Sequence, residues 1–144
     1  MTTVRQILGS KGRDVWSVSP DATVYDAIKL MAEKNAGALV VLEGDLLRGI
    51  ISERDYARKV ILKGKSSKEI PVKEIMSVDV VTIRPEQSIE ECMSLMTHKR
   101  IRHLPVLEEN KLVGVISIGD VVKAIISEQE FTIKQLENYI TGSR

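Results

Sequence analysis

Apolar residues in the N-terminal half of this 144-residue chain alternate between the spacing of strands and the spacing of helices. A β-branched and aromatic run at 15–18 predicts a strand, and apolar residues three or four positions apart predict a helix over 23–35. Two apolar runs, 38–42 and 46–52, flank a polar turn and predict a β-hairpin. A second helix follows, from near 52 to near 64. The order of elements is therefore β-α-β-β-α.

The C-terminal half repeats this order. The pattern predicts a strand at 80–83, a helix that begins at 88 and a hairpin over 104–117. A last helix begins near 120 and extends to about 140, either continuous or with a break near 127–131. The part of this helix beyond 127 has no counterpart in the first half.

The two halves are copies of each other. The pattern Gly-x-x-Ser-x-x-Asp occurs at 49–55 and again 65 residues later at 114–120, and a leading apolar segment occurs at 4–8 and at 72–76. Such a repeat must be recognised before the fold, because one unit alone is often unable to bury its apolar face. The repeat divides the chain into a first motif with its linker, a second motif and a helical tail: 1–71, 72–127 and 128–144.

These patterns predict an α+β fold of two pseudo-symmetric units. A right-handed crossover places both helices of a unit on one face of its small sheet, so the other face is free for the sister unit. The two β-α-β-β-α motifs are therefore expected to pack sheet to sheet. Equivalent clefts between them should contain the Gly-to-Asp turns, each at a helix N-terminus with free N–H groups.

The turn motif itself has two interpretations. A serine followed by an acid three residues later is a capping box, which satisfies N–H groups in the first turn of a helix. That structural role explains either copy alone, but it does not explain the glycine at the head of each motif. Glycine weakens a strand and often marks the close approach of a ligand or of another backbone.

Composition excludes several functions. The 21 basic and 20 acidic residues nearly cancel, which gives no general attraction to nucleic acid or to anionic membranes, and five scattered aromatic residues are too few for a base-stacking platform. A single cysteine excludes an internal disulfide and a cysteine-based zinc cluster. With no signal-peptide pattern and no long apolar run, we expect a soluble cytoplasmic protein.

No group of residues predicts catalysis. Cys92 has two histidines, His98 and His103, near it in sequence, but it occupies the position of Ala27 on the apolar stripe of a predicted helix. Core packing is the favoured interpretation, since free cysteine is among the most buried residues. Two histidines in one short run make a poor metal site without further ligands. The sequence therefore indicates neither an enzyme nor a metal site.

The tandem units, each ending in Gly-x-x-Ser-x-x-Asp, resemble a pair of CBS (cystathionine β-synthase) motifs, a Bateman module. The resemblance extends from about residue 4 to 127. The runs 52–56, 102–106 and 117–122 are similar to those of stand-alone CBS-pair proteins from bacteria and plant organelles. The resemblance implies a non-catalytic module that binds AMP, ADP, ATP, NAD or S-adenosylmethionine between paired motifs, and that commonly forms flat, disc-shaped homodimers.

The resemblance also implies ligand-binding residues, because each family site combines the Ser/Asp turn of one half with the strand starts of the other. An aspartate can accept hydrogen bonds from a ribose diol, and a serine beside a helix N-terminus can donate to phosphate. One expected site comprises Ser52, Arg54, Asp55, Val80, Val81, Ile101, Arg102 and His103. The other comprises Ser117, Asp120, Val15, Trp16, Ala36, Gly37 and Ala38.

The two expected sites differ in charge. Ala36–Ala38 in the first half corresponds to Ile101–His103 in the second, and Arg54 corresponds to Gly119. The cationic set can bind phosphate, although the basic residues are also explained as the solvated C-terminal end of a helix. Unequal affinities are therefore expected, and a ligand such as NAD would suit such asymmetry.

The sequence thus predicts a regulatory sensor of adenine nucleotides. Binding of the nucleotide would shift the conformation of the sensor and so affect a partner protein or its own oligomer. The alternatives are a structural interaction module with degenerate clefts, or a sensor of S-adenosylmethionine. The tail is either the surface for a dimer or partner, or a helix folded back on its own module. The sequence does not identify the physiological ligand, the number of occupied clefts, the regulated partner, or whether a dimer is parallel or antiparallel.

Overall fold

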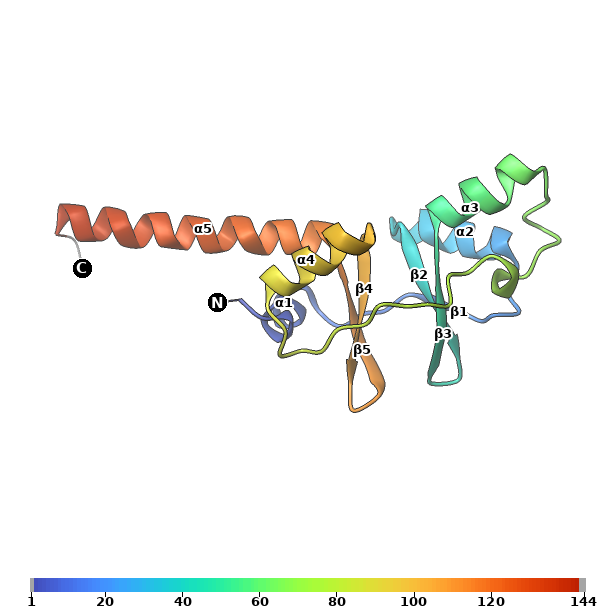
Figure 1. Ribbon diagram of the computed structural model, residues 1–144, viewed down its shortest axis with the longest axis horizontal. Helices are drawn as coiled ribbons and strands as arrows, with labels where there is room; N and C mark the ends of the chain where they lie inside the picture. The colour runs from blue at the N-terminus through green and yellow to red at the C-terminus, as the bar shows by residue number, and fades with distance from the viewer. Residues whose placement is uncertain (1, 143–144) are drawn as a thin grey trace.

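The computed structural model describes residues 2–142 and consists of two similar α+β units placed side by side (Figure 1). Met1, Ser143 and Arg144 lie outside the described residues. Along the chain, the elements before residue 75 are α1, β1, α2, β2, β3 and α3, followed by two short 3-10 turns. Their bounds are Val4–Lys11, Ser17–Val18, Val24–Lys34, Ala38–Glu43, Leu46–Ser52 and Glu53–Lys59, with turns at Ile61–Lys63 and Val72–Glu74.

The second unit contains α4 (Ile89–Lys99), β4 (His103–Glu108), β5 (Lys111–Ser117) and α5 (Ile118–Thr141). In the first sheet β1 pairs in parallel with β2, and β2 pairs antiparallel with β3. In the second sheet β4 and β5 form the equivalent hairpin. Figure 1 shows the two hairpins side by side, with α2 and α3 over the first and α4 and α5 over the second. The predicted α+β class is confirmed.

The predicted strand at 80–83 is wrong. Only Ile83 pairs with the second hairpin, through an isolated parallel bridge to Val106, and the residues before it are extended but unpaired. The Ile83 amide donates to the Pro105 carbonyl at 3.0 Å, and the Leu107 amide donates to the Ile83 carbonyl at 2.8 Å. Pro105 in the neighbouring strand β4 has no backbone N–H group, so it cannot donate the next hydrogen bond of a longer β-ladder. The second sheet therefore has two strands where the first has three.

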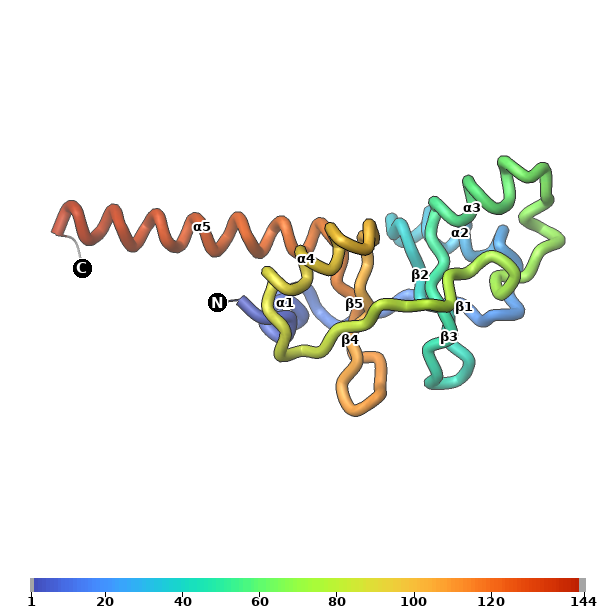
Figure 2. Tube along the Cα trace, in the orientation of Figure 1, coloured from blue at the N-terminus to red at the C-terminus, as the bar shows by residue number. Residues whose placement is uncertain are grey.

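The predicted last helix is present, and it has no break. Helix α5 is continuous from Ile118 to Thr141, through the segment 127–131, and the tail is a direct extension of the second unit. Figure 2 shows its C-terminal half extending away from the two units. No glycine or proline occurs between 120 and 141, so nothing in this stretch favours a kink.

Each unit has its own apolar core, and each core is completed by a segment from the other part of the chain. Val4, Ile7 and Leu8 of α1 are buried in the core of the second unit. In return, Val72 and Ile75 are buried in the core of the first unit. The leading segments are therefore exchanged between the two units.

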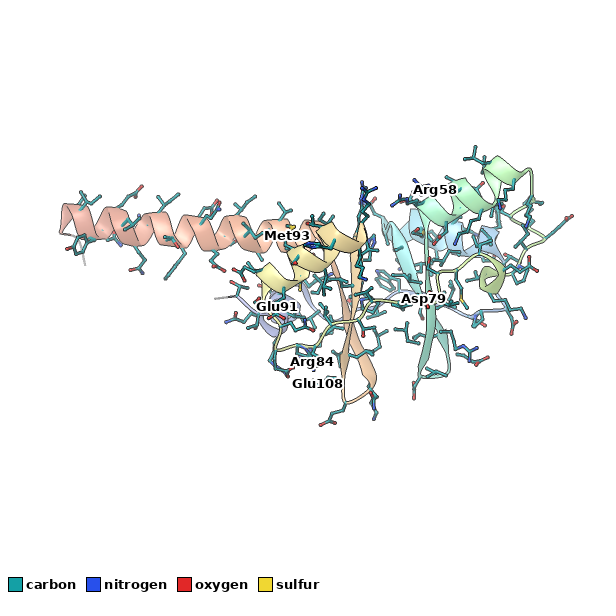
Figure 3. The ribbon with its side chains drawn as sticks, in the orientation of Figure 1. Arg58, Asp79, Arg84, Glu91, Met93 and Glu108 are labelled. Atoms are coloured by element: carbon teal, nitrogen blue, oxygen red, sulfur yellow. The ribbon has the colours of Figure 1, made fainter. Side chains whose placement is uncertain are left out.

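Backbone contacts fix this exchange at both ends. The Val4 amide donates to the Gln87 carbonyl at 2.8 Å, and the equivalent bond runs from Val72 to Ala22 at 2.7 Å. Figure 3 shows Asp79 in the extended segment that passes from the first hairpin to the second. The chain thus crosses between units twice, after α1 at 12–16 and again near Asp79.

Candidate functional site

The two Ser/Asp turns begin helices α3 and α5 in the same way. Ser52 donates from its amide to Asp55 Oδ2 at 3.0 Å, and its Oγ accepts from the Asp55 amide at 3.2 Å. The Ser117 amide donates to Asp120 Oδ2 at 2.8 Å, and Ser117 Oγ accepts from the Asp120 amide at 3.2 Å. Both turns are therefore capping boxes, as one of the two interpretations of the motif predicts.

The two carboxylates have different second partners. Asp55 Oδ1 lies 3.1 Å from Nζ of Lys59, one turn further along the same helix. Asp120 Oδ2 lies 2.6 Å from Nζ of Lys11, which is at the end of α1 and also donates to the Val115 carbonyl at 2.9 Å. Asp55 is therefore bound within its own turn and helix, whereas Asp120 is bound to a lysine from the exchanged segment.

The ion pair controls the ionisation of Asp120. Partial burial by itself raises the pKa of this carboxyl, but the hydrogen bonds from Lys11 and from the Ser117 amide outweigh that effect and lower the pKa below its usual value. The carboxylate is therefore ionised at neutral pH.

Asp120 also lines a cavity of about 510 Å³ between α1 and α5. Lys11 and Lys123 bring positive charge to its wall, and Ile7, Ala124 and Phe131 bring apolar surface. The remaining lining residues are Thr2, Gln6, Ser10, Ser127 and Glu128. The cavity has a volume typical of a small-molecule pocket, with a few charged groups in a partly apolar lining.

The strand starts of the two units meet near the second turn. A Cβ atom on Gly37 would lie 3.6 Å from Cε1 of His103, so the start of β2 contacts the start of β4. His103 pairs with Ser117 across the second hairpin, and Ala38 pairs with Ser52 across the first. Each strand start therefore lies beside the turn of its own unit and faces the other unit.

His103 lies in an electrostatic environment that keeps it neutral. Burial is the main effect that lowers its pKa, the charges of Lys11 and Arg102 lower it further, and Asp120 opposes them. These interactions associate His103 with the Asp120 turn of its own unit. Among residues 2–142, no hydrogen bond or ion pair joins Asp55 to the Ile101–His103 segment, so that expected grouping stays a prediction.

The residues expected to hold the base lie in different surroundings. The Trp16 ring is 41% exposed and lies beneath Nζ of Lys34, 4.4 Å from the ring centroid. Val81 packs against the core of the second unit. Val80 lines a second cavity of about 390 Å³, toward the hairpin tips, with Leu47 and Leu112. The structure thus leaves one face of Trp16 covered by a cation and directs Val80 and Val81 to different places.

The remaining predicted residues are near the turns but make few contacts. Arg54 is exposed in the first turn of α3, and Arg102 is exposed where its carbonyl accepts from the Ile118 amide at 2.8 Å. Neither guanidinium has a hydrogen bond or ion pair within the described part of the chain. Val15 and Ala36 are partly buried at their strand starts. Ile101 packs against the second core.

Sequence reasoning missed Lys11 and Lys59. The ion pair of Lys59 with Asp55 could have been predicted, because Lys59 follows Asp55 by four residues on the same helix. Lys11 lies in a Gly-Ser-Lys-Gly stretch that reads as a flexible turn, and it reaches Asp120 only because α1 packs on the second unit. Sequence spacing alone gives no sign of that contact.

Cys92 is a core residue, as the position of Ala27 in the first unit predicts. Its side chain is fully buried among Leu104, Ile116 and other residues of the second core. Burial raises the pKa of its thiol to about 11, so the thiolate required of a nucleophile is scarce at neutral pH. Within residues 2–142 there is no cluster of three or more potential metal ligands, and no helix is long and apolar enough to span a bilayer.

Two pseudo-symmetric α+β units with exchanged segments and paired helix-capping turns define a tandem-repeat module. The CBS domain family model matches residues 4–62 and 72–127, and the chain therefore belongs to the CBS domain family. CBS-pair proteins are generally regulatory, nucleotide-binding and non-catalytic modules.

Individual relatives agree with this assignment. CBS domain-containing protein CBSX3, mitochondrial, from Arabidopsis thaliana is 43% identical over 151 residues, which cover 98% of this chain and 73% of the relative. A solved CBS-domain protein from Burkholderia ambifaria has a TM-score of 0.86 and 56% identity, covering 89% of this chain and 96% of that one. A hexameric CBS-CP12 protein from bloom-forming cyanobacteria has a TM-score of 0.73 and 35% identity, covering 84% and 70%.

Proposed function

We propose that this protein is a regulatory module that binds an adenine nucleotide, such as AMP, ADP, ATP or NAD, in its inter-unit clefts. It is a non-catalytic, cytoplasmic homodimer. Ligand binding changes its interaction with a protein partner or within its own oligomer. The observation that carries the proposal is the environment of Asp120. It is an ionised carboxylate at a helix N-terminus, it lines a cavity, and its charge acts on His103, which contacts the start of β2 in the other unit.

Each group near Asp120 has a role in this proposal. The carboxylate accepts hydrogen bonds from the two ribose hydroxyls, as an acid does in dinucleotide-binding folds. Lys11 is displaced from Asp120 and becomes free to pair with phosphate oxygens. Arg102 and His103 lie at the start of β4, where the guanidinium pairs with phosphate and the neutral imidazole takes up a proton beside it. The ligand thus exchanges one internal ion pair for several charge-assisted contacts.

The site at Asp55 is proposed to be weaker. Asp55 Oδ2 accepts from the Ser52 amide and from Ser52 Oγ, and Oδ1 pairs with Lys59, so both oxygens are engaged within its own turn and helix, whereas Asp120 is engaged through Oδ2. A ribose there must compete with these bonds. We therefore expect binding at the Asp120 site to be tighter than at the Asp55 site, or to occur there alone.

Calorimetric titration with AMP, ATP, NAD and S-adenosylmethionine tests this proposal. Asp120→Asn should weaken binding of the preferred ligand by on the order of ten- to a hundredfold, because charged hydrogen bonds to the ribose are lost. Glu91→Gln is the matched control: Glu91 forms the same capping box with Ser88 at the start of α4, away from either turn (Figure 3). The control should bind as the unchanged protein does.

A structural module with degenerate clefts is the second candidate, and the internal satisfaction of both aspartates favours it. If that is correct, no adenosine ligand at about a hundred times a micromolar dissociation constant will raise the melting temperature. A true ligand at that ratio adds about 2.7 kcal/mol of stability. If S-adenosylmethionine binds most tightly, the proposed site is retained but its ligand is S-adenosylmethionine and not an adenine nucleotide.

A further inference from the structure

Helix α5 extends beyond the body of the protein. It has 24 residues, so it is about 36 Å long, and Val121 is the one fully buried residue along it. Ala124 and Ile125 still pack against the second core, and Phe131 lines the cavity with α1. Figures 1 and 2 show the remaining turns projecting away from both units. A lone helical extension of this length is marginal in water without a packing partner.

The extension carries an apolar stripe with a heptad spacing. Ile126, Ile133 and Ile140 are seven residues apart, and so are Val122, Gln129 and Leu136. Successive members are thus three or four residues apart and share one face of the helix, as a and d positions do in a coiled coil. The exposed fraction of their apolar members rises from 43% at Val122 to 80% at Ile140.

We propose that this stripe pairs with the same stripe of a second copy of the chain, as an antiparallel two-helix seam. Heptad spacing is the signature of helices that pack on other helices with the same spacing. An antiparallel arrangement is self-complementary: Val122 faces the partner subunit's Ile140, and Ile126 faces the partner subunit's Leu136. Gln129 then faces the partner subunit's Ile133, beside the two-fold axis.

Charge complementarity selects the antiparallel direction. On the edges of the seam, Lys123 comes opposite the partner subunit's Glu137, and this occurs twice in the dimer. Ile125 comes opposite the partner subunit's Tyr139, a residue that is 86% exposed in the single chain. Two Glu130 side chains also meet at the axis, at an exposed edge where repulsion costs a few tenths of a kcal/mol. A parallel seam aligns no acid with a base at these edges.

The body of the protein also favours this direction. Both units lie at the N-terminal end of α5, so an antiparallel seam places the two bodies at opposite ends (Figure 1). Val122 and Ile126 lie close to the body yet are 43% and 49% exposed, so the end of the partner's helix can reach them. This interface uses neither Ser/Asp turn and does not depend on nucleotide binding.

Sedimentation equilibrium on a matched pair of variants tests the surface. Ile133→Lys places a charge in the centre of the seam and should raise the dimer dissociation constant on the order of a hundredfold or more. Gln135→Lys adds the same charge to another face of the same helix and should leave the constant within about twofold. A dimer that survives Ile133→Lys unchanged would refute the seam but not dimerisation elsewhere, and a monomeric unchanged protein would refute both.

Oxidative crosslinking tests the direction. The double variant Ile126→Cys/Leu136→Cys should form disulfide-linked dimers, because these positions face each other in the antiparallel seam. Ile126→Cys alone should not, since the two copies of residue 126 are then about 15 Å apart along the axis. The native Cys92 is buried and does not interfere. Efficient crosslinking by Ile126→Cys alone would overturn the antiparallel arrangement.

Discussion

Gly49 and Gly114 occupy the same position in the two units, and each lies where a segment from elsewhere packs against the strand. A Cβ atom on Gly49 would lie 2.7 Å from the backbone oxygen of Ser77, and one on Gly114 would lie 2.6 Å from Cδ2 of Leu8. Ile50 and Ser77 exchange backbone hydrogen bonds of 3.0 and 2.9 Å at this contact. The glycine of each motif is thus explained by packing of the protein itself.

Gly49→Ala should therefore destabilise the protein by about 1–3 kcal/mol, because backbone atoms give way less easily than a side chain. Gly9→Ala is the control. Gly9 lies within α1 with nothing within 4 Å of its Cβ position, so alanine there should stabilise by about 0.5–1 kcal/mol. Urea unfolding measures both. Equal effects of the two substitutions would contradict the close approach of Ser77.

The pKa of His103 predicts how nucleotide affinity changes with pH. Burial, Lys11 and Arg102 hold this pKa below its usual value, and Asp120 opposes them, so the ring is neutral at pH 7. A bound phosphate favours the imidazolium and raises the pKa, so binding takes up a proton. Affinity should then increase as pH falls from about 7.5 to 6, by at most tenfold per pH unit.

Titration calorimetry at several pH values measures this linkage. The His103→Gln variant, titrated in the same buffers, gives the pH dependence that comes from protonation of the ligand itself, and this is subtracted. In the variant, the part of the difference in nucleotide affinity between high and low pH that is due to His103 should be lost. An equal pH dependence in both proteins would place the phosphate away from His103.

Among the elements, those with a strong period were predictable and those that depend on chain crossing were not. Helices α2 and α4 and both hairpins follow from their apolar spacing, and the helices begin at the capping residues Thr23 and Ser88. The run at 80–83 has the composition of a strand, yet the chain there passes between units and pairs only at Ile83. Local composition does not encode that path.

The candidate site was predictable to the same extent. The repeat located both Ser/Asp turns and the starts of β2 and β4, because matched positions in a duplicated chain occupy matched places. It did not reveal the ion pair between Lys11 and Asp120, since that contact requires α1 to pack on the second unit. The repeated segments 4–8 and 72–76 are equivalent in sequence, but equivalence does not say which core each one joins.

On the scale of the whole molecule, the exchanged segments make the two units one folding unit. The core of the second unit contains Leu8, which is 99% buried, and the core of the first contains Ile75 from the segment that leads into the second. Neither half buries its apolar face with its own residues alone. Units of this size are marginal even when complete, so we expect a single cooperative unfolding transition.

Leu8→Ala tests this cooperativity. The substitution leaves a cavity in the second core and should lower the free energy of unfolding by about 2–5 kcal/mol. Because the units unfold together, the most protected amides of both β2 and β4 should exchange faster by the same factor in native-state hydrogen exchange. If protection is lost in β4 but unchanged in β2, the units unfold separately. The exchanged segments would then be a connection between two domains that fold on their own.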